Sequence, residues 1–273
     1  MADPATPCVA VSTTRTPLTV GPQVDREEVA RLISKYNLLA IPVVDEHQHL
    51  LGIVTVDDAI DALVREGTED VQKFGGMEAL DEPYTQIDFG AMVKKRAGWL
   101  CALFIGEMFT ATAMARFEHE IERAVVLALF IPLIISSGGN SGSQATSLII
   151  RAMALREVTL KDWWRVASRE LPSGIVLGII LGVIGFIRIM LWQKFGWYDY
   201  GVYHTLVAVT VAGALVGVVT FGSLAGSMLP FVLRRFNFDP ASASAPFVAT
   251  LVDVTGLIIY FSVAFVILRG TLL

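Results

Sequence analysis

Apolar residues are distributed unevenly along the 273-residue chain. Residues 1–96 mix apolar and polar positions in ordinary proportions, whereas residues 97–273 contain long apolar runs separated by short charged loops. A helix needs about 20 apolar residues to cross a bilayer, because each residue rises only about 1.5 Å. The pattern therefore predicts a mainly α, polytopic membrane protein. Its five predicted transmembrane helices cover residues 97–115, 124–155, 174–192, 206–229 and 246–268.

The second predicted span contains a run of small and polar residues. Residues 136–142 read Ser-Ser-Gly-Gly-Asn-Ser-Gly within an otherwise apolar segment. We expect the helix to break there, around Gly138, Gly139 and Asn140, and these residues to line a pore. Irregular backbone at this depth is tolerated where it faces protein or a watery cavity, and broken helices often offer their ends to ions. Close helix packing through the glycines is the alternative.

Basic residues in the short loops predict the orientation of the spans. Ten Lys and Arg residues flank one side of the spans and four flank the other. Cytosolic loops carry the excess of Lys and Arg. We therefore expect a multi-pass protein of the plasma (inner) membrane, with a cytosolic N-terminus and an extracytosolic C-terminus.

The first part of the chain predicts a small α/β module. Asp25 is a candidate N-cap for a first helix, with Glu28 three residues later. Strands are expected at residues 40–44 and 50–55, and a second helix from residue 56 to about 65. The predicted domains are this module at residues 1–70, a linking helix at residues 71–96 and the transmembrane domain at residues 97–273. No secretory signal is expected in residues 1–20, which lack an apolar segment behind a basic start.

Composition excludes several classes of function. The net charge of −5 argues against a nucleic-acid partner, which would need clustered Lys and Arg. Cys8 and Cys101 show no metal-ligand spacing, so we expect neither a disulfide nor a site there. No Ser/His/Asp or phosphate-loop arrangement is present, and an enzyme is not expected.

A lone carboxylate in the fifth span, Asp253, is the sharpest candidate for a transport pathway. Polar groups in lipid are costly and usually mark a pathway or a buried partner. The pair Asp239-Pro240 is typical of a helix start, which would place Asp253 roughly 21 Å further along the helix. Ala245 and Ala249 precede it at four-residue intervals and leave space beside its carboxylate. A structural aspartate bonded to a neighbouring helix is the alternative.

Other carboxylates are candidates for cation or proton chemistry. Glu107 lies in the middle of the first span, where it is either protonated or faces the bundle interior, or else contributes to a pore. An acidic group follows the second strand, and oxygen-rich clusters suit Mg²⁺ or Ca²⁺. A solvated acidic helix face is the alternative. The members of this group are Asp57, Asp58, Asp61, Glu66, Glu69 and Asp70.

Residues 52–58, Gly-Ile-Val-Thr-Val-Asp-Asp, and the order of elements around them resemble a CBS module. In such modules the pattern Gly-x-x-Thr-x-x-Asp, here Gly52, Thr55 and Asp58, holds the ribose of an adenine nucleotide. The resemblance thus makes ATP a candidate ligand. CBS modules work in pairs and this chain holds one, so either the chain is shortened or its module pairs with that of a second protomer.

Taken together, these features resemble the MgtE family of magnesium channels and transporters. The most specific segments are residues 137–144 and 148–152, and residues 239–240 with 246–256. The resemblance implies a homodimer with a pore at its two-fold axis, lined mainly by the second and fifth spans. Asp253 matches the family's pore carboxylate and Ala249 the position one turn before it. Asp239 matches an acidic residue near the cytosolic mouth, and Ala245 a position where asparagine can occur.

The resemblance also implies regulation by cytosolic Mg²⁺. The matching sensor carboxylates are Glu27, Asp58, Asp61, Glu66, Glu69 and Asp70, while Asn37 stands where an aspartate is expected. The predicted function is a Mg²⁺-selective channel or transporter, surrounded by membrane lipid and gated by Mg²⁺ bound to the CBS and linking-helix region. The alternatives are a membrane sensor with a cation- or nucleotide-binding CBS module, and a proton-coupled transporter in which Asp253 or Glu107 carries protons.

Overall fold

The computed structural model describes residues 17–272 and divides the chain into two compact units, Met1–Thr68 and Glu69–Leu273. Cys8 and most of residues 1–20, where no secretory signal was expected, lie outside the described residues. The mainly α fold with a small α/β module in front of five spans is confirmed.

The first unit contains helix α2 (Arg26–Tyr36), strands β1 (Ala40–Val44) and β2 (Leu50–Thr55), and the start of helix α3 (Val56–Phe74). The side chain of Asp25 caps α2 by accepting from the backbone N–H of Glu27 at 2.8 Å. The strands pair antiparallel, with Ile41 opposite Val54. The core of this unit lies between α2, β1 and α3. Its buried residues include Val29, Ala30, Ile33, Ile41 and Ala59.

The region between the two units differs from the prediction. Helix α3 continues to Phe74 instead of ending near residue 65, and it stops before Gly76, whose φ of +76° suits glycine. No separate linking helix covers residues 71–96, because α3 ends at Phe74 and the next helix begins at Phe89. Asp88 instead caps helix α4 (Phe89–Arg116), accepting from the N–H groups of Gly90 and Ala91 at 2.8 and 3.2 Å. The basic residues before the first span therefore form the first turns of that span.

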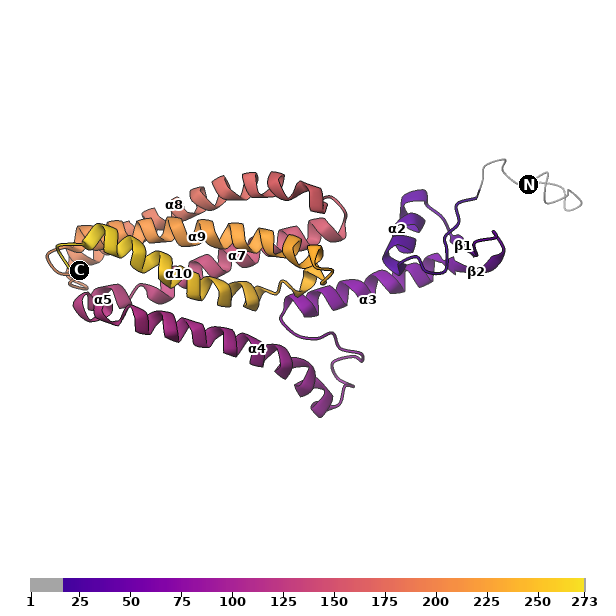
Figure 1. The fold of residues 1–273 in the computed structure, drawn as a ribbon, viewed down its shortest axis with the longest axis horizontal. Helices are drawn as coiled ribbons and strands as arrows, with labels where there is room; N and C mark the ends of the chain where they lie inside the picture. Colours follow the sequence, from indigo (N-terminus) through magenta and orange to yellow (C-terminus); the bar gives the residue numbers. More distant parts are fainter. Residues whose placement is uncertain (1–16, 273) are drawn as a thin grey trace, which may run out of the picture. The chain divides into compact units, whose positions relative to one another are not determined.

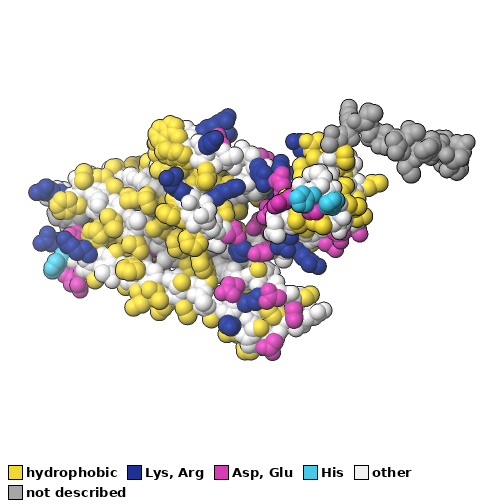
Figure 2. Space-filling model, turned by 45° about the vertical axis from the view of Figure 1, so that its right-hand side comes forward, with side chains coloured by type: hydrophobic (Ala, Val, Ile, Leu, Met, Phe, Trp, Pro, Cys, Tyr) yellow, Lys and Arg dark blue, Asp and Glu magenta, His cyan; other side chains and the backbone are white. Residues whose placement is uncertain are grey.

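The second unit is a bundle of long helices. After α4 come the short helices α5 (Glu118–Arg123) and α6 (Val125–Ala128), then α7 (Ile131–Ala154), α8 (Trp163–Phe195), α9 (His204–Arg235) and α10 (Ala245–Leu268). Within the described residues, five helical segments are long and apolar enough to cross a membrane. Helix α9 occupies the centre and packs against α7, α8 and α10 (Figure 1). Hydrophobic side chains cover much of the outer surface, as lipid contact requires (Figure 2).

The expected helix break at Gly138, Gly139 and Asn140 is wrong. Helix α7 runs without interruption through these residues, and its glycines serve close packing. A Cβ atom on Gly222 of α9 would lie only 2.2 Å from the carbonyl oxygen of Gly138, and one on Gly226 the same distance from that of Gly142. The two backbones are therefore nearly in contact, and small residues are what allow this approach.

The second span is interrupted earlier, between α6 and α7. Pro132 has no backbone N–H, so the carbonyl of Ala128 lacks the donor that a continuous helix would supply. The buried hydroxyl of Tyr260 in α10 donates to the carbonyl of Leu127 at 2.9 Å. The same carbonyl accepts from the Phe130 N–H at 3.1 Å, so α10 adds a second hydrogen bond to the turn between α6 and α7.

Candidate ion site

A cavity of about 430 Å³ lies between α4, α7 and α10, within the predicted spans. It brings together Asp253 and Ala249 of α10 with Gly139 and Asn140 of α7, four residues that the sequence analysis selected. Glu107 of α4 also lines it. The remaining lining residues are Ile131, Pro132, Ile135, Ser136 and Ser143.

Asp253 and Glu107 are the acidic residues of this cavity. Their carboxyl groups are close enough for a hydrogen bond between them. Asp253 is half-buried, whereas Glu107 is exposed on the surface of the isolated chain. Close approach of α4 and α10 brings the two together, since a Cβ on Gly106 would lie 2.9 Å from the Thr250 side chain. Two ionised carboxylates side by side repel one another, so a cation between them would be favoured.

The start of α10 differs from the prediction and changes the depth of Asp253. Asp239 caps only the single 3₁₀ turn η2 (Pro240–Ser242), accepting from the Ala241 N–H at 2.9 Å. Helix α10 begins at Ala245 with Ser244 as its N-cap, and the Trp99 indole of α4 donates to the Ser244 hydroxyl at 3.1 Å. Asp253 therefore lies about 12 Å, rather than 21 Å, from the start of its helix.

Helix α7 presents a polar stripe to the cavity. Ser136, Gly139, Asn140 and Ser143 recur at intervals of three and four residues, which places them on one helix face. The hydroxyl of Ser143 donates to the carbonyl of Ala245 at 3.4 Å, so Ala245 contacts the stripe without lining the cavity. Sequence reasoning missed Ser136 and Ser143, although their spacing relative to Gly139 was available as a signal.

The opposite face of α7 packs on α9. Gly138 belongs to this face, where a Cβ would lie 2.5 Å from the Val218 side chain, and it does not line the cavity. Ser141 and Ser223 share a buried hydrogen bond of 2.6 Å between their hydroxyls. Thr146 donates to the carbonyl of Gly226 at 2.8 Å. These contacts fix the rotation of α7 and so aim its polar stripe at the cavity.

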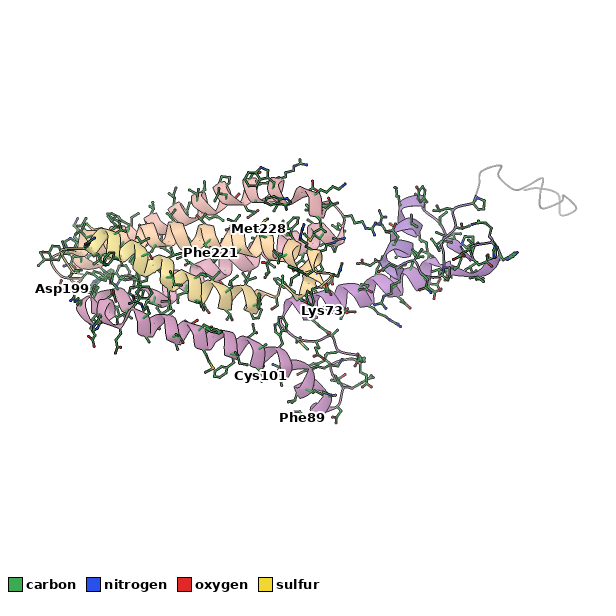
Figure 3. The ribbon with its side chains drawn as sticks, in the orientation of Figure 1. Lys73, Phe89, Cys101, Asp199, Phe221 and Met228 are labelled. Carbon is green, nitrogen blue, oxygen red and sulfur yellow. The ribbon has the colours of Figure 1, made fainter. Side chains whose placement is uncertain are left out.

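Asp239 lies outside the cavity and binds a cation of the protein itself. The Lys73 ammonium at the end of α3 reaches Asp239 at 2.5 Å and Glu69 at 2.6 Å (Figure 3 labels Lys73). Burial alone would lower the pKa of Lys73, but the hydrogen bonds to Asp239 and Glu69 raise that pKa above its ordinary value. Two carboxylates that were predicted as metal ligands are thus bridged by an ammonium group.

The predicted sensor carboxylates are divided between the two units of the chain. Among the residues that the structure describes, no group of three or more His, Cys, Asp or Glu side chains is placed to hold a metal ion. Glu66 is paired with Arg26. Asp61 is exposed on α3, while Glu27 lies on α2 and Asp70 in the second unit.

The nucleotide pattern has a local structural role. Asp58 in the first turn of α3 accepts from the Thr55 hydroxyl at 2.7 Å and from the Thr55 backbone N–H at 3.4 Å, across the junction of β2 and α3. Asp58 also lines a cavity of about 270 Å³ in the first unit, next to Val20, Pro22 and Ala62. Gly52 and Thr55 do not line this cavity.

Fold and cavity together define a class: a multi-pass helical membrane protein with a CBS module and a carboxylate-lined cavity between its spans. Comparison with known proteins agrees. Residues 131–263 match the family model described as MgtE, divalent cation transporter, and residues 9–65 match the CBS domain.

Three proteins named magnesium transporter MgtE are similar to the chain. Those of Thermus thermophilus, Bacillus subtilis and Enterococcus faecalis are 43%, 35% and 35% identical over 90%, 88% and 90% of this chain. The chain spans about half of their length, at 52%, 51% and 51%. The chain belongs to the MgtE family, a family of transporters.

Proposed function

We propose that the chain conducts Mg²⁺ across the membrane through the cavity that contains Asp253. The observation that carries the proposal is the meeting of Asp253, Glu107 and the polar stripe of α7 in one cavity within the spans. Ionisable groups at this depth are costly and therefore indicate a pathway. The relatives' printed names support the choice of magnesium.

The size of the cavity suits a hydrated ion. Mg²⁺ dehydrates reluctantly and keeps several of its six waters when it binds to carboxylates. Six waters of about 30 Å³ each occupy about 180 Å³, which fits within the cavity volume of about 430 Å³. Contacts through water hold the ion weakly enough for it to leave, as conduction requires.

The pathway is completed in this proposal by a second copy of the chain. Glu107 and Asn140 line the cavity and are exposed in the isolated chain, so the cavity opens to one side. A two-fold axis on that side would place two Asp253 carboxylates across one passage. Paired carboxylates favour a divalent over a monovalent cation, because the attraction grows with the charge of the ion.

Regulation by cytosolic Mg²⁺ belongs to the same proposal. Glu69 and Asp239 already share one cation, the Lys73 ammonium, at the end of α3. Additional Mg²⁺ bound to the acidic surface of α2 and α3 would hold this segment in place and keep the pore shut. Loss of Mg²⁺ would leave carboxylates that repel one another and loosen the closure. The proposed orientation places this segment in the cytosol.

The test is a flux assay on the chain in proteoliposomes loaded with a Mg²⁺-sensitive dye. Asp253→Ala should abolish Mg²⁺ uptake while the dimer persists in light-scattering measurements. Glu170→Gln is the matched control, because it removes a carboxyl group from α8, which does not line the cavity. Unchanged uptake by Asp253→Ala would refute the pore assignment.

Proton-coupled transport is a second candidate, favoured by the contact between the Glu107 and Asp253 carboxyl groups. Such a pair can take up and release a proton as an ion arrives or leaves. The same assay separates the two mechanisms: coupled transport requires that an imposed pH gradient drive Mg²⁺ uptake, and a channel responds to the Mg²⁺ gradient and the membrane potential alone. A cation or nucleotide sensor would bind its ligand without any flux.

A further inference from the structure

A second hollow lies on the outer face of α8 and shares no residue with the ion cavity. It has a volume of about 900 Å³ and is built from one helix alone. Its residues recur at intervals of three and four and therefore share one face. They are Arg165, Ser168, Arg169, Pro172, Ser173, Val176 and Leu177, and we call this hollow the α8 groove.

The α8 groove changes from basic to apolar along its length. Arg165 and Arg169 lie at one end, and Val176 and Leu177 lie at the other. Twelve residues separate Arg165 from Leu177 in the sequence, a rise of about 18 Å along a helix. The hollow forms between the two ends because Ser168, Pro172 and Ser173 there have small side chains. The sequence of a charged end followed by an apolar trough matches a phospholipid headgroup followed by its acyl chain.

The two arginines are available to an anion. Both are exposed, and within the described part of the chain neither is within salt-bridge distance of a carboxylate. Asp162 acts electrostatically on Arg165, and Glu170 acts on Arg169. The Asp162 carboxylate also accepts from the Thr159 N–H and hydroxyl at 2.9 and 2.7 Å. Arginine presents a planar set of donors that suits the oxygens of a phosphate group.

Tryptophans place the basic end of the α8 groove at a membrane surface. Trp163 and Trp164 start α8, are 52% and 66% exposed, and pack edge-on with ring centroids 5.5 Å apart. Tryptophan is enriched at the level of the lipid headgroups. Below them, exposed aliphatic residues such as Ile180 and Ile184 continue along α8 toward the hydrocarbon core. Headgroup, interface and acyl region thus follow one another along a single helix.

We propose that the α8 groove binds an anionic phospholipid, with its phosphate on Arg165 and Arg169 and an acyl chain against Val176 and Leu177. Charge complementarity selects an anionic over a zwitterionic headgroup, and the apolar trough selects a lipid over a soluble phosphate. The site is independent of the ion cavity, since α8 contributes no residue to that cavity.

The test measures binding of fluorescent phosphatidylglycerol to the purified chain in neutral detergent. Each arginine near an anionic lipid contributes about a fivefold gain in binding, so Arg165→Gln with Arg169→Gln should weaken binding about 25-fold. The matched control is Arg234→Gln with Arg235→Gln, which removes the same charge from the end of α9, outside the groove. The control should change binding less than twofold.

A second variant keeps both arginines and tests the apolar half. Ser173→Leu fills the trough and should also weaken phosphatidylglycerol binding at an unchanged melting temperature. Equal loss in the Arg234/Arg235 control would show diffuse electrostatics and overturn the proposal. Displacement of the lipid by soluble glycerol phosphate, or tight binding of fluorescent phosphatidylcholine, would also overturn the proposal. The same holds if the Arg165/Arg169 double variant loses the dimer but still binds the lipid.

Discussion

At the scale of single residues, the bridge made by Lys73 gives the acidic residues near the pore a new interpretation. Glu69 and Asp239 were each visible in the sequence as candidate metal ligands, in two separate groups. The ammonium group between them was not visible, because Lys73 and Asp239 are 166 residues apart in the chain. Nothing in the sequence of α3 distinguishes Lys73 from any other basic helix residue. Under the proposed regulation, the Lys73 ammonium and Mg²⁺ would compete for these oxygens.

Replacing Lys73 with methionine should test this competition. Lys73→Met keeps the length of the side chain but leaves Glu69 and Asp239 without their shared cation. We expect a loss of stability of roughly 0.5–1 kcal/mol in Mg²⁺-free buffer, as for partly exposed ion pairs, and a larger recovery on adding Mg²⁺ than in the parent chain. Thermal unfolding across a Mg²⁺ series measures both effects. Lys94→Met, which removes a charge from the exposed start of α4, should show neither.

The raised pKa of Lys73 fixes the pH range of the bridge. A group whose pKa is raised by folding contributes its full stability below its ordinary value of 10.5 and loses it only as the pH rises through the higher folded pKa. The difference in stability between the parent chain and Lys73→Met should therefore stay constant between about pH 7 and about pH 9. A steady decline across this range would contradict the assignment.

The residues of the ion cavity were partly predictable. Asp253 and Glu107 could be selected from sequence because a carboxyl group in an apolar span is conspicuous. Ser136 and Ser143 could have been found from their spacing. The contact between Glu107 and Asp253 could not, since it depends on how α4 approaches α10, and hydropathy carries no information about which helices are neighbours.

At the scale of elements, the glycines of α7 and α9 show why the predicted helix break was wrong. Glycine weakens a helix by about 1 kcal/mol relative to alanine, which favours a break in an isolated segment. Here the near contact of the two backbones, and the hydrogen bond from Thr146 to the Gly226 carbonyl, compensate for that weakness. The strands and the five spans were predictable because their patterns are local. The start of α10 was not, because η2 occupies its expected first turn.

Alanine substitutions on α9 should distinguish glycines that touch a neighbouring helix from glycines with space for a side chain. Gly222→Ala would force a Cβ to 2.2 Å from the Gly138 carbonyl oxygen, so the helices must separate. Overpacking of this kind costs roughly 1–3 kcal/mol or more. Gly213→Ala on the same helix meets its nearest atom, on Val263, at 3.5 Å and should be neutral or slightly stabilising. Thermal unfolding of the purified variants compares them, and equal melting temperatures would contradict the packing described.

At the scale of the whole molecule, the excess of basic residues predicts which loops face the cytosol, and labelling can test this. In a background with Cys8 and Cys101 replaced by serine, single cysteines are introduced at Val202 and Glu157, in the loops after α8 and α7. Both positions are exposed. An impermeant maleimide applied to intact cells should label Val202→Cys and not Glu157→Cys. The reverse pattern would invert the proposed orientation.

The packing of α7 on α9 also limits how the proposed ion passage could change its width. Backbones in near contact leave these two helices little freedom to slide or rotate, so the face formed by α7 is stiff. Helix α4 meets the rest of the bundle chiefly at α10, and little of its apolar surface is buried within the chain. Helix α4 is therefore the side of the cavity that can move most easily. In the proposed channel, opening and closing would therefore be carried by α4, while α7 would stay fixed on one side of the ion.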